Sequence, residues 1–130
     1  MPNPRRANGS RRTKLLNWLR AQARPCWICG LPIDYSLGSG DPRAFECDEI
    51  VPVSRGGSPY DRANVDAAHR CCNQWRRAKP ARMVESLRME ARARGLRWSS
   101  PEEYVRIMRN FEKNNCMRAP VPPPKPTTDW

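Results

Sequence analysis

The sequence has little apolar material and a single histidine. Its mean hydropathy is −0.85 and 14 of its 130 residues are proline, which leaves little for a large buried core. It contains no run of about 18 apolar residues, and its arginine-rich start lacks the apolar stretch of a secretory signal. These absences argue against a membrane partner and predict a cytoplasmic protein.

Acidic residues are missing from the first 24 positions, and the whole chain has a net charge of +11. Residues 1–24 contain seven Lys or Arg, residues 25–72 contain four basic and seven acidic side chains, and residues 73–98 contain eight basic and two acidic ones. An acidic centre between basic flanks suits cation binding in the middle and phosphate binding on either side. The pattern favours a polyanionic partner over arginine faces that are merely solvated.

A basic N-terminal arm with a helix is expected over residues 1–24. Leu15 and Leu19 recur at helical spacing, in a helix that Ser10 could cap and that ends before Pro25. The basic side of this helix could contact a DNA backbone while its apolar side packs on the core.

Two further helices are expected over residues 80–118, followed by a proline-rich tail over residues 119–130. The first helix is closed by Gly95 at its C′ position, and the second begins with a capping box at Ser100. We expect the two helices to pack as a hairpin that supports the core. The tail predicts polyproline structure, as a spacer or as a partner-binding segment.

Two pairs of candidate metal ligands flank the acidic centre. Cys26 and Cys29 have the spacing of a zinc knuckle, and His69 precedes Cys72 by three positions. Since no secretory signal is present, the cysteines are better explained as metal ligands than as disulfides. The sequence therefore predicts a structural Zn²⁺ site, with Cys71 as the rival for the fourth ligand, although the spacing favours Cys72.

Between these pairs, the pattern predicts a strand, a long loop, a second strand and a helix. Residues 45–52 form the expected first strand, Gly56 and Gly57 offer a turn, the return begins at Asn64, and Pro80 must end the helix.

The motifs in this stretch resemble the HNH endonuclease family, in particular its small phage-encoded members. The matching segments are Asp48-Glu49-Ile50-Val51-Pro52, Ser54-Arg55-Gly56-Gly57, Asn64-Val65 and His69-Arg70-Cys71-Cys72-Asn73. The resemblance covers about residues 25–79, and it implies an α+β fold with a small ββα-metal core, a structural pair of zinc knuckles and flanking helices.

The resemblance also implies a function for this core. Asp48 and Asn73 would hold one divalent ion, Mg²⁺ or Mn²⁺, because hard cations prefer oxygen ligands, and Asn64 would brace the long loop. The ion would stabilise the charge that develops during phosphodiester hydrolysis. The implied substrate is double-stranded DNA, with a phage terminase as partner and the host cytoplasm as location.

One position departs from the family pattern. The family's general base is a histidine at the position occupied here by Glu49, and a carboxylate with a pKa of about 4.3 is a weaker base. His69 is assigned to the zinc site, so no histidine is left to act as the base. Glu49 could therefore act as the base or as an added metal ligand, or its presence could mean that cleavage has been lost. Two hypotheses follow: a metal-dependent DNA endonuclease, and a zinc-stabilised DNA-binding module.

Several basic side chains are expected to contact DNA phosphates. They are Arg11, Arg12, Lys14, Arg55, Arg76, Arg77 and Lys79.

Overall fold

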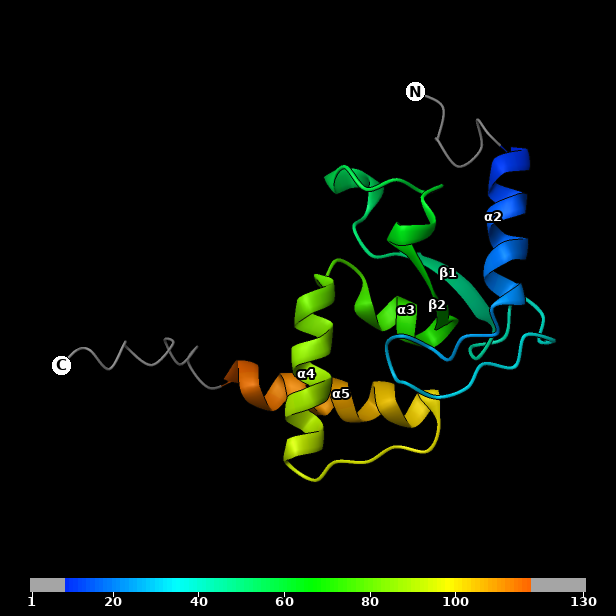
Figure 1. Ribbon diagram of the computed structural model, residues 1–130. Coiled ribbons are helices and arrows are strands. Elements are labelled where there is room, and N and C mark those ends of the chain that lie inside the picture. Colours follow the sequence, from blue (N-terminus) through cyan, green and yellow to red (C-terminus); the bar gives the residue numbers. More distant parts are fainter. Residues whose placement is uncertain (1–8, 118–130) are drawn as a thin grey trace.

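The structure, a computed structural model, describes residues 9–117 of the chain, with side chains described up to residue 114. This part of the chain has an α+β fold with four α-helices and one two-stranded antiparallel sheet (Figure 1). In chain order the elements are α2 (Gly9–Ala21), β1 (Phe45–Glu49), β2 (Val65–His69), α3 (Arg70–Arg76), α4 (Ala81–Ala93) and α5 (Pro101–Met117). The expected order of strand, long loop, strand and helix is confirmed for the centre of the chain.

The two strands are paired along their whole length, with the first residue of β1 opposite the last residue of β2. Successive residues of a strand point to opposite faces of a sheet. Phe45, Cys47 and Glu49 therefore share one face of β1, whereas Glu46 and Asp48 share the other. This alternation decides which acidic side chains can meet.

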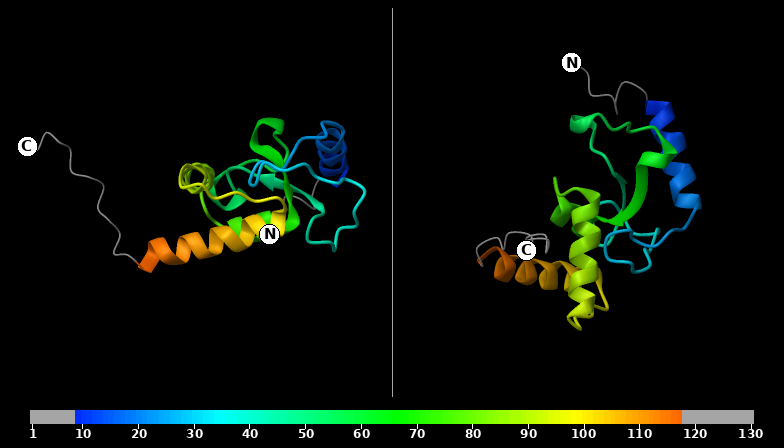
Figure 2. Two further views of the ribbon diagram at one scale, coloured as in Figure 1. Left: turned by 90° about the horizontal axis from the view of Figure 1, so that it is seen from below. Right: turned by 60° about the vertical axis from the view of Figure 1, so that its left-hand side comes forward.

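Helix α2 covers the first of these faces, on the side of the sheet away from the other helices (Figures 1 and 2). Its apolar stripe buries Leu15 and Leu19, as their spacing predicts. Together with residues of both strands they form a small core cluster of Leu15, Leu19, Phe45, Val65 and Ala67. The expected cap is wrong, because the helix begins at Gly9 and Ser10 lies within its first turn.

A larger core lies on the other side of the sheet, between the cysteine knuckle and helices α3, α4 and α5. The buried ring of Tyr104 is at its centre, 5.3 Å from the ring of Trp75 and 5.0 Å from that of Trp98, both in edge-on geometry. Cys26, Cys29 and Cys72 belong to the same cluster, so the candidate metal ligands are part of the core that holds the helices.

Helices α4 and α5 begin and end close to where their signals predict. Gly95 follows α4 with a φ of 84°, a conformation that favours glycine. At the start of α5, the Glu103 amide donates to Ser100 Oγ at 3.1 Å, so Ser100 is the cap. The Glu103 carboxylate accepts a bond from the Ser99 amide, one residue earlier than a capping box requires.

The expected hairpin of α4 and α5 is wrong, because α4 crosses α5 (Figures 1 and 2). The connection between them passes through Trp98, which is buried and donates from Nε1 to the Cys29 carbonyl at 2.9 Å. This bond ties the connection to the knuckle, so it cannot form the short turn that an antiparallel pair needs.

The proline-rich tail expected over residues 119–130, like the first eight residues of the basic arm, lies outside the described residues. Among the described helices, none combines the length and the apolar character that a membrane crossing requires.

Candidate metal centre and neighbouring polar site

The knuckle at Cys26 and Cys29 is a tight turn built by the backbone. The Gly30 amide donates to the Cys26 carbonyl at 2.8 Å, and Gly30 has a φ of 82°, which favours glycine at this point. The amides of Cys29 and His69 point at Cys26 Sγ, at 3.5 and 3.4 Å. The knuckle and the end of β2 therefore converge on one sulfur.

His69 is oriented by a bond outside the cluster. Its Nε2 lies 3.0 Å from the Pro32 carbonyl, which can only accept, so Nε2 carries a proton and Nδ1 faces the sulfurs. Nδ1 lies 3.4 Å from Cys29 Sγ and 4.0 Å from Cys72 Sγ. This arrangement presents Nδ1 as the metal-ligating atom.

The four candidate ligand atoms of Cys26, Cys29, His69 and Cys72 lie within 4.8 Å of one another, and all four residues are buried. Three thiolates and one imidazole are a donor set typical of a closed, structural zinc site. The four residues predicted from their spacing are thus brought together into a possible metal site. Cys71 is half-buried and outside this group, which answers the question of the fourth ligand in favour of Cys72.

Hydrogen bonds among the four side chains shift the pKa values of the cluster in different directions, and they raise the pKa of Cys72. Burial lowers the pKa of His69, but hydrogen bonds with Cys26 and Cys29 outweigh it and raise the pKa to about 10. Burial raises the pKa of Cys26, but bonds with Cys29, Cys72 and His69 outweigh it and hold the pKa far below its usual value. A bound metal ion would replace the proton of His69 and neutralise the thiolate charge.

Two residues that the sequence did not indicate hold the knuckle from outside. Trp98 donates to the Cys29 carbonyl, and Arg88 of α4 donates to the Ile28 carbonyl at 2.8 Å. They are 69 and 60 residues away from these partners along the chain, and no local pattern links them.

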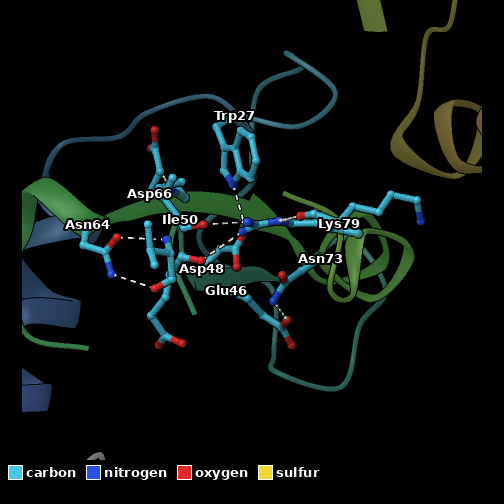
Figure 3. A network of polar contacts seen from close by, with 12 residues as sticks. Trp27, Glu46, Asp48, Ile50, Asn64, Asp66, Asn73 and Lys79 are labelled. Atoms are coloured by element: carbon cyan, nitrogen blue, oxygen red, sulfur yellow. Dashed lines mark hydrogen bonds and ion pairs between the residues drawn. The ribbon is translucent and has the colours of Figure 1, made fainter. Parts of the chain in front are cut away.

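The second face of β1 carries a polar site beside α3 (Figure 3). Asp48 is buried, and its Oδ2 accepts from Trp27 Nε1 at 2.9 Å and from Arg76 Nη1 at 2.7 Å. Burial raises the pKa of Asp48, although the charge and hydrogen bond of Arg76 act against this rise. Both of these bonds end on Oδ2, and within the described part of the chain Oδ1 has no hydrogen bond.

Arg76 is an interior residue, with only 1% of its surface exposed. Besides Asp48, its guanidinium donates to the carbonyls of Glu49, Ile50 and Lys79, at 2.9, 2.6 and 3.0 Å. The expectation that Arg76 contacts DNA is therefore wrong, because burial and these four bonds commit its side chain to joining α3 and β1.

Asn73 is positioned by an acidic residue that the sequence did not single out. Its Nδ2 donates to Glu46 Oε1 at 2.9 Å, across the gap between α3 and β1 (Figure 3). Since an ionised carboxylate only accepts, the amide must turn Nδ2 toward Glu46 and leave Asn73 Oδ1 as a free acceptor. The two-residue period of a strand could have indicated Glu46, which precedes Asp48 by two positions.

Glu49 does not join this group. It points to the face of β1 that α2 covers, where its Oε2 lies 3.6 Å from Arg12 Nη2. The structure therefore brings together Asp48 and Asn73, with Glu46 between strand and helix, and places Glu49 on the other face.

The long loop after β1 is held by Asn64 and by close packing at Gly57. Asn64 Oδ1 accepts from the Val51 amide at 2.9 Å, and Nδ2 donates to the carbonyls of Val51 and Ser58, both at 3.0 Å. A Cβ on Gly57 would lie 1.7 Å from the Val51 carbonyl oxygen, so only glycine fits. Asn64 thus makes the bracing bonds that the resemblance implies, away from the Asp48 carboxylate.

The other expected DNA contacts divide into two sets. Arg11, Lys14, Arg55 and Arg77 are exposed. Arg12 and Lys79 are largely engaged, Arg12 with Glu49 and Lys79 with Glu112 at 3.5 Å.

Comparison with protein-family models, with curated proteins and with solved structures finds no match.

Proposed function

We propose that the chain is a metal-dependent endonuclease of the HNH type that hydrolyses phosphodiester bonds in double-stranded DNA. The observation that carries this proposal is the placement of Asp48 on β1 and Asn73 on α3 in the same polar site (Figure 3). In the described structure, Oδ1 of each residue has no hydrogen bond. Asp48 is fixed through Oδ2, which accepts from Trp27 and Arg76, and Asn73 is fixed through Nδ2, which donates to Glu46. Two such oxygens are the ligands that Mg²⁺ or Mn²⁺ prefers.

The residues present fit such an ion. Asp48 and Asn73 would hold it, and it would supply charge stabilisation at the phosphate and the leaving oxygen. The chain's own residues do the positioning: Arg76 and Trp27 fix the Asp48 carboxylate, and Glu46 turns the Asn73 amide. The clustered thiolates and imidazole behind β2 hold the strand and helix in place as a structural zinc site.

The basic surface and the likeness to phage HNH proteins support DNA as the substrate. Along the sequence, basic segments flank an acidic centre, as expected for a protein that positions a phosphate backbone over a cation. A phage terminase partner and a host cytoplasmic location belong to this proposal through the same resemblance.

A second candidate function is a zinc-stabilised DNA-binding module with weak or lost cleavage. The placement of Glu49 favours it, because the residue at the family's base position contacts Arg12 on the face away from Asp48. General-base catalysis is typically worth about 10²- to 10⁴-fold, so loss of the base would slow cleavage strongly.

A plasmid-nicking assay separates the two candidates. The wild type should nick supercoiled DNA with Mg²⁺ or Mn²⁺, and Asp48→Asn should reduce the rate by about 10²-fold or more, because it removes the anionic ligand. Asn can still accept the bonds of Trp27 and Arg76, but it leaves the buried Arg76 charge without its carboxylate, so the rates are compared at a temperature where circular dichroism shows both proteins folded.

The matched control is Asp66→Asn. Asp66 lies opposite Asp48 in the strand register but pairs with Arg24 at 3.4 Å. The Asp66→Asn variant should nick supercoiled DNA at the wild-type rate. Absence of nicking with any divalent metal from about pH 6 to 9, with DNA binding intact, would leave only the DNA-binding module.

A further inference from the structure

An open groove runs between α3 and α5, beginning at the polar site. One hollow of about 530 Å³ is lined by Asn73, Gln74, Arg77 and Arg109. A second, of about 490 Å³, shares Gln74 and Arg109 with the first and extends along α5. Its lining is Cys71, Gln74, Glu102, Val105, Arg106, Arg109 and Asn110. We name these two adjoining hollows the α3–α5 groove.

The groove is positively charged and its charges are largely unneutralised. Arg77 and Arg109 are exposed, and in the described part of the chain their side chains make no hydrogen bond or ion pair. Arg106 has one exposed contact, at 3.5 Å to Glu103. The single carboxylate of the lining, Glu102, is already paired with Arg43 at 2.8 Å.

This state contrasts with several other arginines in the described part of the chain, whose guanidinium groups are engaged. Arg76 and Arg88 each hold main-chain carbonyls, and Arg24 pairs with Asp66. Free guanidinium groups beside free amides, in an open and polar hollow, match phosphate and sugar oxygens better than a small apolar ligand.

Arg77 adds an independent observation. It follows the last residue of α3 with φ 50° and ψ −118°, a backbone conformation that suits glycine and strains other residues. An arginine is thus held in this conformation where it lines the same hollow as Asn73.

We propose that the α3–α5 groove binds consecutive phosphates of the DNA strand that passes the Asp48–Asn73 site, which makes α5 part of the DNA interface. This inference rests on the proposed function and extends it to a helix outside the HNH-like segment. Arg77 contacts the phosphate nearest the site, and Arg109 and Arg106, one helical turn apart on α5, contact phosphates further along.

The test is the salt dependence of binding to a short fluorescent DNA duplex, measured by anisotropy. Each phosphate contact contributes about 0.9 to the slope of log affinity against log salt concentration. Arg77→Gln and Arg109→Gln should each reduce the magnitude of this slope by about that amount. In the nicking assay both variants should raise KM and leave the rate at saturating DNA nearly unchanged, since neither touches the reacting atoms.

The control is Arg97→Gln, which removes the same charge outside the groove. Arg97 is exposed, is not among the lining residues of either hollow, and donates to the carbonyls of Arg92 and Leu96 after the end of α4. Its slope should equal that of the wild type.

Three outcomes overturn the inference. If the groove variants keep the wild-type slope, the groove is not in the interface, although the proposed function stands. If Arg97→Gln lowers the slope equally, the effect is one of net charge alone. If the wild type does not bind duplex DNA, the inference and the proposed function fail together.

Discussion

At the residue scale, the ion pair between Arg76 and Asp48 decides how the polar site is held. Both side chains are buried, and the guanidinium also satisfies three carbonyls around the end of β1 and the end of α3. A buried charge whose partner is removed is left uncompensated, and this costs far more than losing an exposed pair.

We therefore expect Arg76→Met to lower the free energy of unfolding by about 3–5 kcal/mol. The variant keeps the apolar stem and leaves Asp48 buried without a countercharge, so the pKa of Asp48 rises further. When the pKa of a carboxyl is higher in the folded state than in the unfolded state, the protein loses stability as the pH rises through the folded-state pKa. The difference in unfolding free energy between Arg76→Met and the wild type should therefore shrink as the solution is acidified. Urea unfolding at several pH values measures it.

The neighbouring residue supplies the control. Arg77 is exposed, and Arg77→Gln should change the unfolding free energy by no more than about 0.5 kcal/mol. Equal effects of the two substitutions would mean that the buried ion pair does not stabilise this site.

His69 gives a second prediction at this scale. Zn²⁺ must displace the protons of the cysteine thiols, whose ordinary pKa is about 8.5, and hydrogen bonds with Cys26 and Cys29 raise the pKa of His69 as well. The apparent Zn²⁺ affinity should therefore rise at least about tenfold per pH unit between pH 6 and 8. Competition with a chromophoric chelator measures this, and a pH-independent affinity would contradict a donor set of three thiolates and one imidazole.

At the element scale, the sequence predicted most of what local patterns can encode. The residue pattern predicts the two strands and α3, Gly95 predicts the end of α4, and Ser100 predicts the start of α5. Each of these signals acts over only a few residues. The crossing of α4 over α5 could not be predicted, because it depends on Trp98 bonding to Cys29, far away along the chain. The role of Glu46 was within reach, since strand alternation places it beside Asp48.

The loop between β1 and β2 offers the element-scale prediction. A methyl group at Gly57 would collide with the Val51 carbonyl oxygen and with the Asn64 amide that braces the loop. Gly57→Ala should therefore displace the loop, increase its cleavage by proteases and slow DNA nicking, while the zinc content stays the same. Limited proteolysis followed by mass spectrometry locates the cuts.

Gly38→Ala is the matched substitution for this experiment. Gly38 has a negative φ, and a methyl group added there would meet no other atom within 4 Å. Its variant should therefore resist proteolysis like the wild type. Protection of the loop in Gly57→Ala would show that the loop adapts to the extra methyl group.

At the scale of the whole molecule, the candidate zinc ligands connect otherwise separate parts. They come from the knuckle after α2, from the end of β2 and from α3, and the three cysteines belong to the core in which α4 and α5 pack. The low hydropathy of the sequence leaves little apolar material for a large buried core, so a metal site that links these parts would add to their stability. The sequence predicted the four ligands because knuckle spacing is local, but it did not show that they share a core with Tyr104 and Trp98.

Two adjacent cysteines allow a sharp test of this organisation. Cys72 is buried in the cluster, whereas Cys71 is half-buried and lines the α3–α5 groove. If zinc binding supplies folding free energy to the whole core, Cys72→Ser should lose most bound zinc and the cooperative unfolding transition. Cys71→Ser should retain about one zinc per chain and unfold like the wild type.

Metal analysis of the purified variants, with circular dichroism during heating, gives both readouts. Chelation of the wild type should reproduce the Cys72→Ser behaviour, and added zinc should restore the transition in the wild type but not in that variant. Loss of zinc in Cys71→Ser instead would move the fourth ligand to the neighbouring thiol. Full zinc loss with an unchanged transition would mean that the core is stable without the metal, and that the cluster serves some purpose other than folding.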